Sequence, residues 1–236
     1  MKKLSIFIAL FIATFAAKAQ NIQMHYDLGE GRNYLTSTVE LFKVDKMGST
    51  FFFIDMDYNA NGFDGVSQAY WEVARSFKVS QECAFQPRIE YNGGFFSAKK
   101  SENDYAALPI NNAVLVGGQY TWNTADFSKV FTLSLNYKWI EHKHDASFQI
   151  TGVWALNFFD NKLSLTGFAD FWKEDVLTFA DNGEVKNKEF VFITEPQFWY
   201  NVNKNFAVGS EIEISSNFAG NDGFMVNPTL AVKWTL

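Results

Sequence analysis

Cysteine is almost absent from the sequence: Cys83 is the only one, so an intramolecular disulfide is impossible. The chain also lacks the clustered cysteines and histidines of a structural zinc site. Its three histidines are His25, His142 and His144, and the last two form a His-Lys-His-Asp segment more typical of a solvated loop than of a metal site. We therefore expect a fold held by hydrogen bonds and packing, with no metal or cofactor.

Long apolar runs are also missing after residue 19, where none reaches the about 20 residues of a transmembrane helix. The one run, 4–15, is too short to span a bilayer, follows two lysines and precedes the small-x-small segment 17–19. This order predicts a signal peptide over residues 1–19 and an exported domain over residues 20–236. The alternative is a buried N-terminal helix. Gln20 stands where a lipoprotein would have cysteine, which argues against a lipid anchor.

Basic residues are in the minority, with 20 Lys and Arg against 26 Asp and Glu. The predicted signal contains three of the basic residues and none of the acidic ones, which leaves 17 against 26, a net charge of −9. A nucleic-acid partner calls for clustered Lys and Arg, so no such partner is expected.

Aromatic residues, in contrast, make up 18% of the chain, with 26 phenylalanines. They follow a period of two, which indicates strands with one apolar face. In residues 130–140 the apolar face consists of Phe131, Leu133, Leu135, Tyr137 and Trp139. Residues 146–159 and 224–236 repeat the pattern.

Alternating segments of this kind fill the chain after residue 19, and most match the roughly 9–11 residues of a tilted membrane strand. We predict an all-β protein, a twelve-stranded antiparallel transmembrane β-barrel surrounded by outer-membrane lipids. The predicted strands are 21–28, 34–44, 50–59, 66–79, 87–97, 112–123, 129–141, 146–159, 163–174, 189–202, 206–218 and 224–236.

The connections alternate between short turns and a set that contains two long, charged segments, Lys99–Asn111 and Val176–Lys188. Outer-membrane barrels have short periplasmic turns and longer outer loops. We therefore expect both long segments to face the outside and both termini to face the periplasm.

Outward-facing aromatic residues are expected near the strand ends, where they would form girdles at the two membrane interfaces. The predicted periplasmic girdle is Trp122, Phe131, Phe158, Tyr200, Phe206 and Trp234. The predicted outer girdle is Tyr137, Trp139, Phe148, Phe171, Phe190 and Phe224. Arg75 also falls on the outward face, so it either lies low enough to reach the interface or is turned inward by a bulge. A soluble β-sandwich or lipocalin-like barrel in the periplasm is the alternative fold, because alternation alone cannot say which face meets water.

The inward face holds the candidate site residues, and it is rich in carboxylates and aromatic rings. The acidic members are Glu40, Asp55, Asp57, Glu72, Glu90, Asp170, Glu195, Glu211 and Glu213, the basic ones are Arg88, Lys138 and Lys233, and the aromatic ones are Phe51, Phe53, Phe168, Trp172 and Trp199. One interpretation is a narrow, acidic pore in which aromatic rings stack flat solutes. The other is a filled interior in which the charges satisfy one another. The carboxylates are spread over many strands, which does not favour a glycosidase pair, and no enzyme is predicted.

Several segments resemble an uncharacterised outer-membrane family of Bacteroidetes, which in turn resembles the nucleoside-specific channel-forming (Tsx-like) porins. The segments are 34–43, 45–49, 51–57, 70–72, 90–94, 166–172 and 195–200. The resemblance implies a twelve-stranded barrel and a channel for small polar solutes, with nucleosides as candidates. The chain ends in Leu236 instead of the usual aromatic residue. The competing hypotheses are a barrel that transports nothing, either structural or plugged, and a lipid-facing enzyme.

The strands joined at 203–205 predict an acidic wall, because pairing outward from that turn sets Glu195 near Glu213 and Gln197 near Glu211. Pairing around 219–223 would set Lys233 near Gly209, diagonal to Glu211. Opposed like charges destabilise a sheet, so a raised pKa, a counter-ion or solute hydroxyls would have to offset them.

A base could then stack on Trp199 while its sugar meets the carboxylates. Alternatively, Arg88 or Lys138 reaches across and closes the network.

Overall fold

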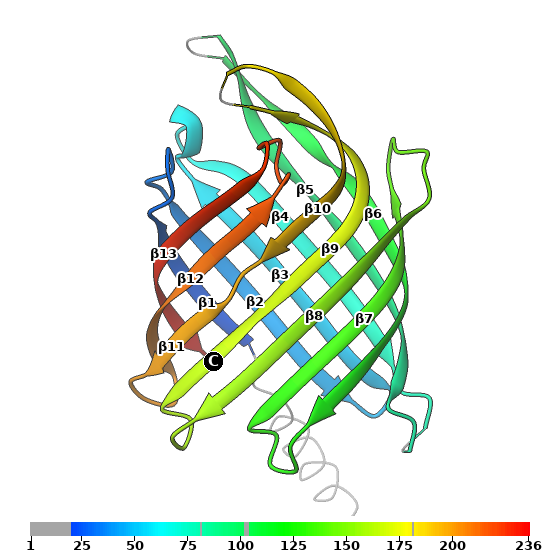
Figure 1. Cartoon of the computed structure of the whole chain (residues 1–236). Helices are drawn as coiled ribbons and strands as arrows, with labels where there is room; N and C mark the ends of the chain where they lie inside the picture. Colours follow the sequence, from blue (N-terminus) through cyan, green and yellow to red (C-terminus); the bar gives the residue numbers. More distant parts are fainter. Residues whose placement is uncertain (1–19, 81, 102–103, 181) are drawn as a thin grey trace, which may run out of the picture.

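A computed structural model describes residues 20–80, 82–101, 104–180 and 182–236. The predicted signal peptide, residues 1–19, lies outside the described residues. Antiparallel strands form one tilted sheet that closes into a barrel, with the end of the chain at the lower rim and hairpins projecting from the upper rim (Figure 1). Of the described residues, no helix has both the length and the apolar character required to cross a membrane.

The strands follow the predicted segments closely in the middle of the chain and differ near its upper hairpins. Their bounds are β1 Gln20–Asp27, β2 Leu35–Asp45, β3 Gly48–Tyr58, β4 Val66–Phe77, β5 Phe85–Ser101, β6 Asp104–Asn123, β7 Lys129–Ile140, β8 Ser147–Phe158, β9 Leu163–Phe179, β10 Val185–Thr194, β11 Gln197–Asn201, β12 Phe206–Ser216 and β13 Phe224–Thr235. A short 3₁₀ helix, η1 (Ala60–Gly62), lies between β3 and β4.

The barrel closes where the first strand pairs with the last, with Asn21 opposite Thr235 and Asp27 opposite Thr229. Every other strand pairs with its sequence neighbour, and β10 and β11 share one place in the wall between β9 and β12. The thirteen labelled segments therefore make twelve wall positions. The predicted twelve-stranded antiparallel barrel is confirmed.

The predicted strand 189–202 is wrong in one respect, because it is broken at Glu195-Pro196 into β10 and β11. Proline has no N–H to donate to a neighbouring strand, so the ladder is interrupted at this point. Gly167 on β9 adapts to the break with a φ of 147°, and a Cβ there would lie 2.4 Å from the Glu195 carbonyl oxygen. The break places Glu195 outside the regular ladder, on the lumen wall.

The two long segments predicted as loops are instead hairpins of continuous strand. The β5–β6 ladder extends to Ser101 opposite Asp104, and the β9–β10 ladder extends to Phe179 opposite Val185. A ladder can continue above the barrel because its cross-strand hydrogen bonds join backbone groups and do not depend on the polarity of the side chains. Both hairpins project from the rim opposite the C-terminus (Figure 1). They therefore lie at the same end of the barrel, as predicted.

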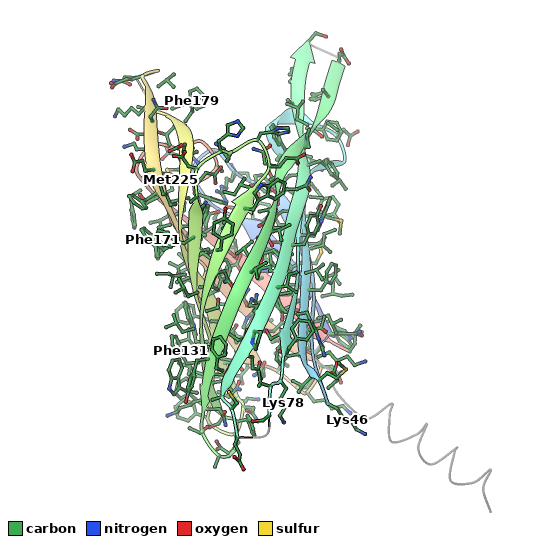
Figure 2. All side chains as sticks on the ribbon, turned by 90° about the vertical axis from the view of Figure 1, so that its right-hand side faces the viewer. Lys46, Lys78, Phe131, Phe171, Phe179 and Met225 are labelled. Atoms are coloured by element: carbon green, nitrogen blue, oxygen red, sulfur yellow. The ribbon has the colours of Figure 1, made fainter. Side chains whose placement is uncertain are left out.

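The outer surface of the barrel is apolar along almost every strand. The exposed side chains include Leu135 (61%), Leu230 (63%) and members of both predicted girdles, such as Trp122 and Trp139. Figure 2 shows Phe131 towards the end that carries Lys46 and Lys78, with Phe171 nearer the opposite end. An apolar surface of this extent is far larger than water-soluble monomers expose.

Arg75 shows how the wall tolerates an outward charge. It pairs with Asp45 through two hydrogen bonds of 2.8 Å and also donates to Thr50, beside the β2–β3 turn. The β3–β4 register is regular here, since its irregularity lies at Asp57 and Tyr58. The first of the two predicted possibilities is therefore correct: Arg75 lies at the rim, and no bulge turns it inward.

An arginine at the centre of the apolar surface should destabilise the barrel strongly. Leu135 lies in the middle of β7, whereas Leu163 begins β9 next to a turn, and both point outward. We expect Leu135→Arg to lower the free energy of unfolding in lipid vesicles by about 2–4 kcal/mol, and Leu163→Arg by only about 0–1 kcal/mol. Equal losses in urea titrations of the two variants would contradict a membrane-embedded surface.

Candidate functional site

The candidate site residues all lie on the inner side of the barrel wall. Six of them, together with many polar neighbours, are buried, and the others are half-buried. The buried ones are Glu90, Lys138, Asp170, Trp172, Trp199 and Glu213. The half-buried ones are Phe51, Phe53, Asp55, Asp57, Glu72, Arg88, Glu195, Glu211 and Lys233, as are Glu40 and Phe168. Low exposure on the inner face means that the lumen is narrow.

Glu195 projects from the strand break and has no hydrogen-bond partner for its carboxylate among the residues that the structure describes. It interacts electrostatically with Glu211 on β12, Asp55 on β3 and Asp170 on β9. Carboxylates from widely separated strands therefore approach one another across the lumen. The neighbouring pair predicted from the turn is present, with Gln197 opposite Glu211 and donating to it at 2.6 Å.

Arg32, in the link between β1 and β2, supplies a cation that sequence reasoning missed. Its guanidinium contacts Asp27 on β1 at 2.9 Å and Glu213 on β12 at 3.0 Å. Arg32 therefore connects the β1–β2 link to β12, which lies beyond β13 in the wall. Burial works to lower the pKa of Arg32, but the carboxylates of Glu213 and Asp27 outweigh it and raise the pKa. Strand periodicity assigns faces only within strands, which is why this link residue was not identified.

The predicted position of Lys233 is wrong by two residues. Lys233 lies opposite Ala207, and Gly209 lies opposite Ala231, because the β12–β13 ladder already closes at Ser216 and Phe224. The ammonium lies 4.0 Å from the centroid of the Trp199 ring. That ring is 1% exposed, so the face expected to stack a base is covered by a lysine.

A second polar group lines the opposite wall. Arg88 bonds to Glu90 and donates to Gln119 at 3.1 Å, and Lys138 donates to Gln149 at 2.8 Å. Neither cation reaches the carboxylates of β12, so the predicted alternative, in which Arg88 or Lys138 closes that network, is wrong. Asp170 is buried beside them, and its Oδ1 atom has no hydrogen-bond partner among the described residues.

Neutral donors satisfy several of the other carboxylates. Thr38 donates to Asp55 at 2.5 Å and Thr36 donates to Asp57 at 2.7 Å. Glu72 accepts hydrogen bonds from Tyr70 at 2.8 Å and from Asn92 at 3.2 Å. Neutral side chains thus hold these acids in place, and acidic residues outnumber basic ones among the lumen residues.

Aromatic rings line β3 and β4 beside these acids. The ring centroids of Phe51 and Phe53 are 5.8 Å apart, and those of Phe53 and Tyr70 are 5.9 Å apart. Because Phe53 lies opposite Glu72, the row presents ring surfaces next to a carboxylate. All three rings are half-buried.

An apolar collar lies inside the barrel and was not predicted. We define the collar as Ala113, Leu115, Ile140, Trp172, Val191 and Ile193, with Phe168, Val176 and Phe218 packed against it. Leu115 has no exposed surface, and Phe218 meets the Trp172 ring edge-on at 6.1 Å. Residues 113–116 are apolar on both faces, so alternation could not single out the inward ones.

Among the described residues, no group of three or more His, Cys, Asp or Glu side chains has a geometry that could hold a metal ion. The acidic lumen residues therefore do not form a coordination sphere of that kind.

Residues 19–236 match the family model described as a domain of unknown function, DUF5020. The chain belongs to this family. The uncharacterised family expected from the sequence is thereby found, whereas the likeness to nucleoside-specific channels and the bacterial group stay predictions. No curated protein matches the chain significantly.

Solved porin structures share the DUF5020 fold. The NanC porin is similar with a TM-score of 0.56 and 10% identity, covering 92% of this chain and 100% of that one. The KdgM porin in complex with disordered oligogalacturonate is similar with a TM-score of 0.50 and 10% identity, covering 92% and 98%. Both of these structures are porins.

The upper rim of this DUF5020 barrel is tied by an ionic contact between two elements. Asp222, in the β12–β13 link, contacts Lys186 at 2.8 Å and Lys188 at 2.9 Å on β10, and Thr178 donates to it at 3.2 Å. Hydrogen bonds from Lys186 and Lys188 lower the pKa of Asp222 to about 2. Because the pKa of Asp222 is lowered in the folded protein, its ionised carboxylate stabilises the contact fully above the ordinary carboxyl pKa of about 4. This stabilisation is lost as the pH falls through about 2.

We expect Asp222→Asn to loosen the link from the hairpin at neutral pH. The amide of Phe179 donates to Gly220 at 2.8 Å and reports on this contact. Its hydrogen-exchange protection factor should fall several-fold in the variant, and in the unmodified protein it should persist until the pH approaches about 2. Equal protection in both proteins at pH 7 would show that Asp222 does not hold the link.

Proposed function

We propose that this chain is an outer-membrane channel for small polar solutes that are neutral or positively charged. The observation that carries the proposal is the contrast between its two surfaces: an apolar exterior, and a closed interior rich in carboxylates. Rings of carboxylates favour cations and repel anions. Residues 1–19 would act as the signal peptide that exports the chain, and the long hairpins would face outside the cell.

The charge of the lumen argues for a cargo different from that of the KdgM structure, which holds oligogalacturonate, a polyanion. In this chain Glu195 interacts electrostatically with Asp55 and Asp170, two carboxylates from other strands. A polyanion that entered the lumen would be repelled by these carboxylates. We therefore expect this chain to exclude polyanions of that kind.

Nucleosides are the specific solutes we propose, as the resemblance to Tsx-like channels suggests. The aromatic row of Phe51, Phe53 and Tyr70 offers half-buried ring surfaces for a base. Asp55 and Glu72 lie on the same two strands, where their oxygens could accept hydrogen bonds from ribose hydroxyls.

Swelling of liposomes that contain the purified protein tests this function. Uridine and a neutral disaccharide of similar size should enter, with uridine faster, whereas digalacturonate should enter more slowly than either. Entry of all three at rates set by size alone would contradict the selectivity, and entry of none would contradict the channel.

A barrel that transports nothing is the second candidate, and the apolar collar is the observation that favours it. Leu115 is completely buried, and Val191 is 2% exposed, although both lie inside the barrel. A hydrophobic constriction can exclude water and ions even where the backbone leaves room. The two candidates predict different conductances for the unmodified protein and for a variant with a polar collar, as described in the Discussion.

A further inference from the structure

Two tryptophans inside the barrel are each covered by a lysine. The Lys233 ammonium lies 4.0 Å from the Trp199 ring centroid, and the Lys138 ammonium lies 4.2 Å from that of Trp172. Tryptophan has the most favourable ring face for a cation, and the interaction strengthens where water is excluded. The same pairing thus occurs twice, on different parts of the wall.

Each tryptophan ring is held independently of its lysine. The Trp199 indole N–H donates to Gln197 at 3.0 Å, and the Trp172 indole N–H donates to Glu174 at 2.9 Å. The rings would therefore keep their orientation if the lysine moved away. A ring fixed in advance costs little to bind a ligand.

A second ring meets each tryptophan edge-on. His25 lies against Trp199 at 6.1 Å with an interplanar angle of 84°, and Phe218 lies against Trp172 at 6.1 Å and 85°. Each lysine thus covers one ring of a perpendicular aromatic pair. Paired aromatic walls of this kind are what proteins use to bind substituted ammonium groups.

The ammonium groups of Lys138 and Lys233 make few contacts apart from the tryptophan rings. Among the described residues, no carboxylate lies within ion-pair distance of either ammonium, although Glu40 and Asp170 interact with them electrostatically. Lys138 has one further hydrogen bond, to Gln149. Lysine has a flexible four-carbon stem, so its ammonium can leave the ring without a change in the backbone.

We propose that the two tryptophan faces are binding sites for the ammonium groups of small organic cations, and that Lys138 and Lys233 occupy them in the empty barrel. The proposal rests on the channel function, for which it names a substrate class, namely solutes with a primary or substituted ammonium group. An incoming ammonium would displace the lysine, while the surplus of lumen carboxylates balances the added charge.

The test removes the internal competitor. Lys233→Ala should bind propylammonium about tenfold more tightly than the unmodified protein, as expected for a desolvated cation–ring contact that no longer has to be displaced. Binding is read from the rise in melting temperature as propylammonium chloride is added, with sodium chloride at equal ionic strength as reference. Lys204→Ala, in the β11–β12 turn, is the matched control and should behave like the unmodified protein.

Adding Trp199→Leu to Lys233→Ala should remove the gain in binding and leave only the weaker response of the unmodified protein, because the Trp172 ring is still covered by Lys138. If Lys233→Ala does not fold, Lys138→Ala applies the same test to the Trp172 ring. A propylammonium response of Lys233→Ala equal to that of Lys204→Ala, or a gain in binding that persists after the loss of Trp199, would overturn the proposal. Because melting is measured without transport, a protein that binds propylammonium but conducts nothing would refute the channel alone.

Discussion

Replacing Glu195, Glu211 and Glu213 together with glutamine should remove most of the preference for cations. These three side chains lie on the wall formed by the β10–β11 break and β12, and Glu195 also interacts with Asp55 across the lumen. Glutamine keeps their size and hydrogen-bonding capacity while removing three negative charges from the narrow section. Cation selectivity follows the fixed charge that lines a constriction, so the ratio of potassium to chloride permeability should fall several-fold towards one.

The matched control removes three negative charges from exposed links between strands instead of from the lumen. Glu30, Glu82 and Glu184 are exposed residues in links between strands, and their joint replacement with glutamine should leave the permeability ratio nearly unchanged. Single-channel recordings under a salt gradient measure both variants. If the lumen variant keeps its selectivity and loses only stability, the acidic wall serves packing and does not select solutes. Any block of the current by nucleosides should weaken in the lumen variant alone.

Making the apolar collar polar should increase the conductance several-fold. Leu115 and Val191 lie in the collar, on β6 and β10, and neither has an appreciable exposed surface. Serine at both positions would shorten the side chains and provide hydroxyls for water, which relieves a hydrophobic constriction. Val116, beside Leu115 but 54% exposed on the outer surface, supplies the control Val116→Ser.

The two candidate functions give opposite results here. A channel with a narrow collar conducts before the change and conducts more after it. A barrel that transports nothing stays silent in the unmodified form. If the collar variant and the unmodified protein are both silent, while both migrate as folded barrels on unboiled gels, transport through the lumen is excluded.

The strands could be predicted because alternation is a local property. Phe131, Leu135 and Trp139 share the outward face that period two assigns to them, and all three are exposed. The pairing of Gln197 with Glu211 was also predictable, since a short turn fixes the register of the strands that it joins. These inferences needed no knowledge of distant parts of the chain.

What could not be predicted depends on links and on contacts across the lumen. Lys233 was misplaced because the seven-residue link 217–223 fixes the register less tightly than a short turn. Arg32 was missed because a link has no period from which its direction can be inferred. The contact of Lys233 with Trp199 spans β12, so it depends on the curvature of the closed barrel as well as on the pairing of neighbours.

The central claim is that an acidic lumen makes this barrel a channel that prefers cations. The most direct test is the reversal potential of the purified protein in a planar lipid bilayer under a tenfold gradient of potassium chloride. We predict a potential of the sign given by potassium moving down its gradient. A potential of the opposite sign, or a folded protein that carries no current, would contradict the claim.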